Sequence, residues 1–100
     1  LITKLLLLPL PYLTVLSASL CSELTEVDMD APRVEVLNFK SSKNLRSIKL
    51  HSNTPYLANV DVEECESLDA DFLRQLAVNA NFLKRVRHRG VSEFNARGFV

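Results

Sequence analysis

One apolar pattern recurs along the chain, and it constrains the fold more than any other feature of the sequence. Three segments begin at Pro11, Pro32 and Pro55, so that their starts lie 21 and 23 residues apart. In each segment apolar residues follow the proline by 2, 5, 7 and 13 positions, and a Cys or Ser follows it by 10. A fourth start at Asn81 comes 26 residues later and keeps the pattern as far as Val86. A period of this length predicts a chain built of stacked repeats.

Within each repeat, the apolar residues 5 and 7 positions after the proline predict one short β-strand. Side chains alternate across a strand, so Leu16 and Ala18 are expected to point to the same side. A single strand of this kind buries too little apolar surface to offset the entropy of ordering it. Copies stacked about 4.8 Å apart share a continuous core instead. We therefore expect parallel strands in which Leu16, Leu37 and Val60 form one column.

The first two repeats contain a second apolar stretch, and the third contains a helical pattern in its place. Leu24, Val27 and Met29 predict extended chain on the second side of the first repeat, and the next repeat has the same spacing. In the third repeat the segment 69–79 places its apolar residues on one helical face, with Asp69 as an N-cap. We expect this repeat to combine a strand with a helix.

The spacing resembles the cysteine-containing class of leucine-rich repeat. The resemblance is carried by Leu57-x-x-Val60-x-Val62-x-x-Cys65-x-x-Leu68 and then by Leu73-x-x-Leu76-Ala77. The shorter repeats, which begin with Ala-Pro or Thr-Pro, are similar to those of plant-type F-box/leucine-rich-repeat proteins. Over residues 10–88 the resemblance implies an α/β leucine-rich-repeat solenoid with parallel stacked short strands. It implies about four coils (one coil being one repeat), with a helix in the third.

The resemblance also implies a function. F-box/leucine-rich-repeat proteins are substrate receptors of Skp–cullin–F-box ubiquitin ligases, so the chain is expected to bind a protein substrate without catalysing a reaction. A Skp-type adaptor and a cullin would bind through an F-box, which these residues lack. One alternative is an intracellular leucine-rich-repeat scaffold without an F-box, and another is a secreted repeat protein. The intracellular interpretations imply a cytoplasmic or nuclear protein.

The secreted alternative depends on residues 1–19. Lys4, an apolar run and the small residues 17–19 resemble a secretory signal peptide. However, residues 11–24 match the later repeats position by position, which a cleaved segment has no reason to do. We therefore expect residues 1–9 to form the helix of a preceding coil, residues 10–89 the repeats, and residues 90–100 an irregular end.

Composition argues against several other classes of protein. Twelve Lys and Arg residues balance twelve Asp and Glu residues, without the basic excess of a dedicated nucleic-acid-binding domain. The apolar run near the start is interrupted by Lys4, Pro9 and Pro11 and is shorter than the roughly 20 residues that span a membrane. Gly90 and Gly98 are too few for a glycine-rich phosphate loop. We expect neither a nucleic acid nor a membrane as partner, and no cofactor.

The two cysteines are expected to be reduced, buried thiols. Cys21 and Cys65 occupy equivalent positions two coils apart, roughly 9–10 Å, which exceeds the limit of about 7 Å for a disulfide. Two cysteines are also too few for a closed zinc site, and no metal is expected. A catalytic Cys–His pair is not favoured, because neither His51 nor His88 has a recognisable orienting partner in the sequence.

Basic residues cluster late in the chain, and a nucleic-acid-binding patch is one interpretation of them. We prefer a charge ladder between strands. If the fourth strand lies in register beside the third, basic side chains lie beside polar or acidic ones, and each opposite pair contributes about 0.2–1 kcal/mol. The expected neighbours are Arg85 with Asn59, Arg87 with Asp61, and Arg89 with Glu63.

The same register defines a candidate protein-binding face, because repeat solenoids use rows of outward side chains as extended binding surfaces. The alternative is that these side chains only face solvent. The predicted face consists of Val15 and Ser17; Val36, Asn38 and Lys40; Asn59, Asp61 and Glu63; and Arg85, Arg87 and Arg89.

Overall fold

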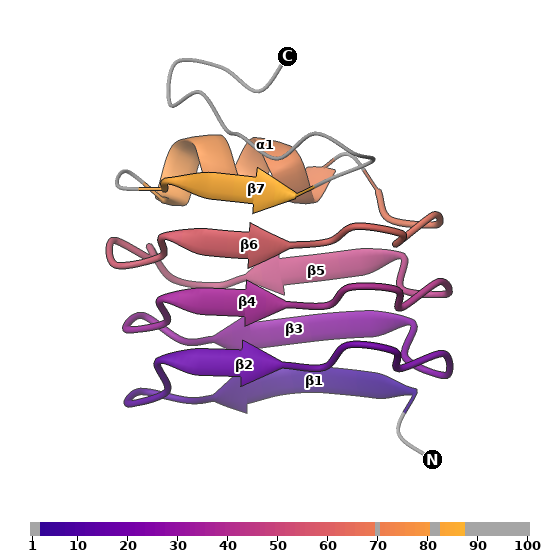
Figure 1. The fold of residues 1–100 in the computed structure, drawn as a ribbon. Coiled ribbons are helices and arrows are strands. Elements are labelled where there is room, and N and C mark those ends of the chain that lie inside the picture. The colour runs from indigo at the N-terminus through magenta and orange to yellow at the C-terminus, as the bar shows by residue number, and fades with distance from the viewer. Residues whose placement is uncertain (1–2, 70, 81–82, 88–100) are drawn as a thin grey trace.

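Two parallel β-sheets and one helix make up the described part of the chain (Figure 1). The computed structural model describes residues 3–69, 71–80 and 83–87. In chain order the elements are β1 (Lys4–Pro9), β2 (Val15–Ser17), β3 (Glu26–Asp30), β4 (Val36–Asn38), β5 (Ser47–Leu50), β6 (Asn59–Asp61), α1 (Asp71–Asn79) and β7 (Arg85–Arg87). The predicted mixed α/β class with parallel strands is confirmed.

The chain alternates between the two sheets. One sheet has the strand order β1-β3-β5 and the other has the order β2-β4-β6-β7. Figure 1 shows the strands of each sheet lying one above another from the N-terminus upward, with the two sheets running in opposite directions. In the second sheet Leu16 pairs with Leu37, Leu37 with Val60, and Val60 with Val86. The predicted column of apolar residues is therefore confirmed.

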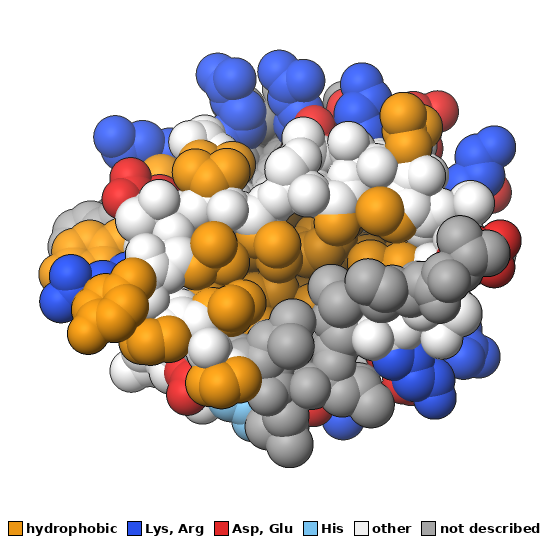
Figure 2. All heavy atoms as spheres, turned by 90° about the horizontal axis from the view of Figure 1, so that it is seen from below, with side chains coloured by type: hydrophobic (Ala, Val, Ile, Leu, Met, Phe, Trp, Pro, Cys, Tyr) orange, Lys and Arg blue, Asp and Glu red, His pale blue; other side chains and the backbone are white. Residues whose placement is uncertain are grey.

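The core is closed in the middle of the stack and open at the end formed by β1 and β2. Leu37 is 0% exposed and Val60 is 1% exposed, whereas Leu16 at the equivalent position is only half-buried. Ala18 and Cys21 are half-buried in the same way and pack against the core. Figure 2 shows hydrophobic side chains gathered across the middle of this lower end. At one position of the repeat, burial therefore also depends on where the repeat lies in the stack.

Each of the first three repeats turns at a residue in the left-handed conformation. The residues are Leu20, Ser41 and Glu64, with φ of 60°, 62° and 61°, and each lies nine positions after its proline. This conformation costs a non-glycine residue roughly 1–2 kcal/mol. The turn is held by hydrogen bonds between neighbouring repeats, from Leu20 N to Lys40 O (2.9 Å) and from Ser41 N to Glu63 O (2.8 Å). Stacking therefore keeps a conformation that these residue types do not prefer.

The prediction of a helix within residues 1–9 is wrong, because Lys4–Pro9 forms strand β1. It pairs in parallel with β3, with Lys4 opposite Glu26, and the Lys4 Nζ to Glu26 Oε2 distance is 3.4 Å. A short run of consecutive leucines has no helical period, so periodicity cannot distinguish a strand from a buried helix. Pro9 lacks an N–H and limits the length of any helix here, whereas β3 offers a row of backbone partners.

The helix predicted for the third repeat is confirmed as α1. Asp69 Oδ1 accepts a hydrogen bond from Asp71 N at 2.7 Å, as expected of an N-cap. Phe72, Leu73 and Leu76 on one face of the helix are buried in the core. Within the described ranges, no helix is both long enough and apolar enough to cross a membrane.

Helix α1 takes the place of a further strand beside β5, and Gln75 supplies the hydrogen bonds that such a strand would make. Its Oε1 accepts from Leu50 N at 3.0 Å, and its Nε2 donates to Ile48 O at 2.9 Å. Edge strands carry unpaired backbone groups that invite association with other chains. One amide side chain therefore satisfies part of the β5 edge.

Replacing Gln75 by Ala is expected to lower the free energy of unfolding by about 1 kcal/mol, because two half-buried hydrogen bonds are lost. Arg74→Ala is the matched control on the same helix, since Arg74 is exposed and makes only a long ion pair with Asp71 (3.8 Å). Urea unfolding followed by circular dichroism measures both. Equal effects of the two substitutions would contradict this role of Gln75.

Candidate functional site

The outward side chains of β2, β4, β6 and β7 form two rows across the sheet. The first row runs from strand to strand through Val15, Val36, Asn59 and Arg85. The second row runs through Ser17, Asn38, Asp61 and Arg87. All eight residues are exposed or half-buried, and we refer to them as the candidate face.

Two further predicted face residues, Lys40 and Glu63, lie beyond the ends of β4 and β6. Lys40 N donates to Asn38 Oδ1 and Glu63 N donates to Asp61 Oδ1, both at 3.0 Å. These turns fix the Asn38 and Asp61 side chains at equivalent positions on neighbouring strands. Arg89 lies outside the described residues.

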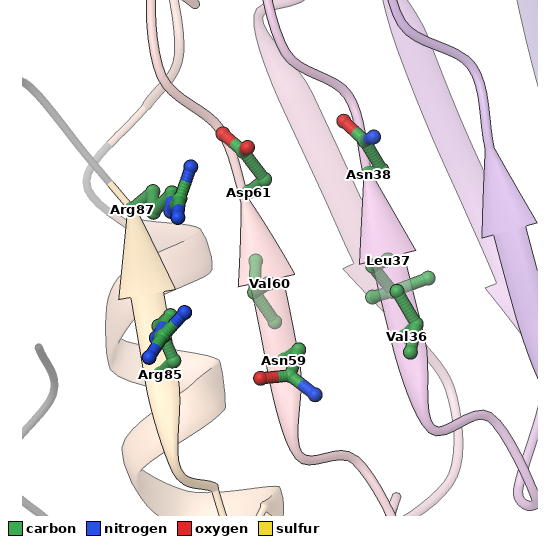
Figure 3. Close-up of a pocket in the computed structure, with 8 residues that line it drawn as sticks. All are labelled: Val36, Leu37, Asn38, Asn59, Val60, Asp61, Arg85 and Arg87. Carbon is green, nitrogen blue, oxygen red and sulfur yellow. The ribbon is translucent and has the colours of Figure 1, made fainter. Parts of the chain in front are cut away.

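The candidate face contains a shallow hollow of about 280 Å³ over β4, β6 and β7 (Figure 3). Its polarity changes from strand to strand: Val36 is apolar, Asn59 on the next strand carries an amide, and Arg85 on the last carries a cation. Asp61 contributes the carboxylate in the second row. The hollow can therefore offer apolar contact, amide hydrogen bonds and positive charge within three strands.

The register of the predicted charge ladder is confirmed, but ion pairs do not form along it in the described residues. Arg85 lies opposite Asn59, and Arg87 lies opposite Asp61. The ion pairs of the described residues lie elsewhere, between Lys4 and Glu26 and between Arg74 and Asp71, and the imidazole of His51 contacts Asp28. The pairing of Arg89 with Glu63 falls outside the described residues. Arg85 and Arg87 are exposed and can turn toward a ligand.

The two cysteines are free, as predicted, but only Cys65 is buried. Its thiol donates to Phe39 O at 2.9 Å, in the preceding repeat. Burial raises the pKa of the Cys65 thiol, with smaller contributions from Asp61 and Glu64, against a hydrogen bond from the Ser42 backbone that lowers it. The prediction that Cys21 is also buried is wrong, because Cys21 lies at the open end of the core and is half-buried.

The two thiols are expected to react at different rates. At neutral pH an aromatic disulfide reagent should modify Cys21 readily and Cys65 slowly, because the thiolate is the nucleophile and burial disfavours it. Mass spectrometry of the partly modified protein assigns the sites. Equal modification rates, or a faster Cys65, would contradict the burial of Cys65.

The raised pKa of Cys65 also makes the free energy of unfolding depend on pH. Because the folded-state pKa lies above its ordinary value of 9.0, the contribution of Cys65 to stability is complete below pH 9.0 and is lost as pH rises through the folded-state pKa.

His51 has a partner that the sequence did not reveal. His51 Nε2 lies against Asp28 Oδ1, and His51 N donates to Met29 O at 2.9 Å. Asp28 lies on β3 directly opposite Lys49 on β5, so His51 is its diagonal neighbour. The contact could be found only once the register between the two strands was known. Cys65 follows β6 of the other sheet, and its thiol donates to Phe39 O. His88 lies outside the described residues.

Exposed side chains also directly follow the proline of each repeat, a feature that the sequence did not reveal. Tyr12 is 81% exposed and Tyr56 is 62% exposed, and each comes directly after the proline of its repeat. Arg33 occupies the same position in the repeat between them, and its guanidinium carbon lies 6.0 Å from the centre of the Tyr12 ring. This contact is at the outer limit of a cation–π interaction.

Among the described side chains, no cluster of three or more His, Cys, Asp or Glu residues could hold a metal ion.

Comparison with family models, with curated proteins and with solved structures finds no match to this chain.

Proposed function

We propose that this chain is part of a leucine-rich-repeat solenoid of about four coils, and that its candidate face binds a protein ligand without catalysing a reaction. The observation that carries the proposal is the in-register arrangement of outward side chains across β2, β4, β6 and β7, with a hollow between them. Stacked strands of this kind present a broad surface whose side chains can vary without disturbing the core.

Three features support the solenoid. The strands of each sheet add in chain order, one per repeat. The turns repeat as well, because Leu20, Ser41 and Glu64 share one unusual conformation at one position in the repeat. Two of the three Cys or Ser positions act alike as well: Ser42 Oγ donates to Ala18 O, and Cys65 Sγ donates to Phe39 O.

We further propose that the parent protein is an F-box-type substrate receptor of a ubiquitin ligase, in the cytoplasm or nucleus. This proposal rests on the resemblance of the repeats. An intracellular scaffold without an F-box uses the same face and differs only outside these residues. The secreted alternative would remove residues 1–19, and with them β1 and β2, which pair with β3 and β4. That pairing favours an intracellular protein.

The proposal is tested by blocking the hollow without changing its charge. Asn59→Trp places a large side chain on β6 at the hollow, and Ser47→Trp places the same side chain on β5 of the other sheet. The immobilised full chain is used to capture proteins from a cell extract, and each captured protein is then purified and its affinity measured. For a protein that binds the candidate face, we expect Asn59→Trp to lower the affinity at least about tenfold and Ser47→Trp to leave the affinity unchanged.

Equal binding by the two variants and the original chain would overturn the candidate face. The ubiquitin-ligase proposal needs a separate measurement on the full-length parent. Co-purification of a Skp-type adaptor and a cullin would support it, whereas a ligand that binds the face of a parent without those partners would support the scaffold.

A further inference from the structure

We infer that the ligand of the candidate face is an extended protein segment carrying an acidic side chain and an apolar side chain four residues apart. The inference rests on the proposed function and names the class of ligand. The acidic side chain meets Arg85 and Arg87 on β7, and the apolar side chain meets Val15 and Val36 on β2 and β4.

The spacing follows from strand geometry. Neighbouring strands lie about 4.8 Å apart, so the three steps from β2 to β7 span about 14 Å. An extended segment rises about 3.3–3.4 Å per residue, and its side chains return to the same side every second residue. Residues four positions apart therefore face the same way and lie about 13–14 Å apart, which matches the distance from Val15 to the strand that carries Arg85.

The middle of the face suits the backbone of such a segment. Asn38 and Asn59 carry amides that can both donate and accept hydrogen bonds. Asn59 lies between Val36 and Arg85 in the first row, and Asn38 lies beside Val36 on β4 in the second row. Val15 is 54% exposed, an apolar side chain where a solvated strand would carry a polar one. An extended ligand lying across the strands would cover Val15 and satisfy its own backbone on the amides.

The charges favour a carboxylate over a nucleic acid. Arg85 and Arg87 are exposed, and among the described residues neither forms an ion pair. Arginine binds carboxylates through two parallel hydrogen bonds. Asp61 lies in the same hollow and Glu63 follows it, so a phosphate backbone running along β6 would meet negative charge. One carboxylate bound at Arg85, which lies opposite Asn59, meets no acidic side chain in its own row.

Selection of random nine-residue peptides on the folded chain tests the inference. We expect the selected peptides to carry Asp or Glu four positions from Leu, Ile, Val or Phe more often than the unselected library. Against the double variant Arg85→Glu, Arg87→Glu, the affinity of a selected peptide should fall at least about tenfold. The matched control is Lys43→Glu, Lys49→Glu, which changes the net charge equally away from the face and should leave the affinity unchanged.

A second variant, Arg85→Gln with Arg87→Gln, removes the charge without reversing it and should weaken binding less than the Glu variant does. Circular dichroism and thermal unfolding check that each variant is folded. Raising the salt concentration should lower the affinity of the selected peptides, because salt screens exposed charge pairs.

The outcomes separate this inference from the proposed function. Peptides that lose binding in Asn59→Trp but show no acidic preference would overturn the acidic ligand and leave the face standing. Peptides that bind equally to all variants would overturn both. Tight binding of a labelled single-stranded oligonucleotide at physiological salt, lost in the Arg85→Glu, Arg87→Glu variant, would overturn the peptide in favour of a nucleic acid.

Discussion

Leu37→Ala is expected to lower the free energy of unfolding by about 2–5 kcal/mol, whereas Leu16→Ala, at the same position of the preceding repeat, is expected to cost clearly less. Leu37 is 0% exposed and lies between Leu16 and Val60 in the column of apolar residues. Its removal deletes apolar contacts on both sides and leaves a cavity. Leu16 is half-buried at the open end of the core, where water can fill the space that a smaller side chain leaves.

The two variants are compared by urea unfolding, with the slope of the transition checked so that a change in the denatured state is not mistaken for a change in stability. Val60→Ala serves as an internal control in the middle of the column, where Val60 is 1% exposed. It should resemble Leu37→Ala in kind, with a smaller effect because fewer carbon atoms are removed. A loss at Leu16 as large as that at Leu37 would contradict the open end.

The period of the repeat was enough to predict the parts of the fold that depend on stacking. Leu37 and Val60 lie in one column because each must bury the same face of a short strand, and spacing alone predicts that face. The helix α1 was predictable for the same reason, since Phe72, Leu73 and Leu76 follow a helical period. The outward positions on the candidate face then follow from the alternation of side chains along each strand.

Features that depend on a single local competition could not be predicted in this way. The run that forms β1 has no period, so only its pairing with β3 distinguishes a strand from a helix. Leu20 adopts a left-handed conformation that its side chain disfavours, because its N–H is held by Lys40 O in the next repeat. Gln75 caps the β5 edge through a long, flexible side chain whose target depends on how α1 packs. Each of these features depends on a contact between segments that are distant in the sequence.

The candidate face was predicted by position but not by chemistry. Alternation placed Asn59, Asp61, Arg85 and Arg87 outward, and the structure brings them together over one hollow. The expected ion pair between Arg87 and Asp61 does not form, although the two residues are in register. Asp61 instead accepts a hydrogen bond from Glu63 N, as Asn38 does from Lys40 N. The charge of Arg87, which was expected to stabilise the stack through Asp61, therefore lies exposed on the surface.

Ser42→Ala is expected to lower the free energy of unfolding by about 1–3 kcal/mol, because it leaves two backbone groups without a partner. Ser42 is 0% exposed, its Oγ donates to Ala18 O at 2.9 Å, and the same atom accepts from Cys21 N at 3.3 Å. The hydroxyl thus joins its own repeat to the turn of the preceding repeat. Alanine removes one oxygen atom and cannot replace either hydrogen bond.

Ser42→Cys is the matched control, because the chain itself places a cysteine at this position in the next repeat. There Cys65 Sγ donates to Phe39 O, the carbonyl equivalent to that of Ala18. A thiol at position 42 should therefore keep the bond to Ala18 O and lose only the weaker acceptor for Cys21 N, at less than half the cost of alanine. Urea unfolding measures all three chains. If Cys and Ala at position 42 are equally destabilising, the hydrogen bond between repeats does not hold them together, and the preference for Cys or Ser here reflects side-chain volume alone.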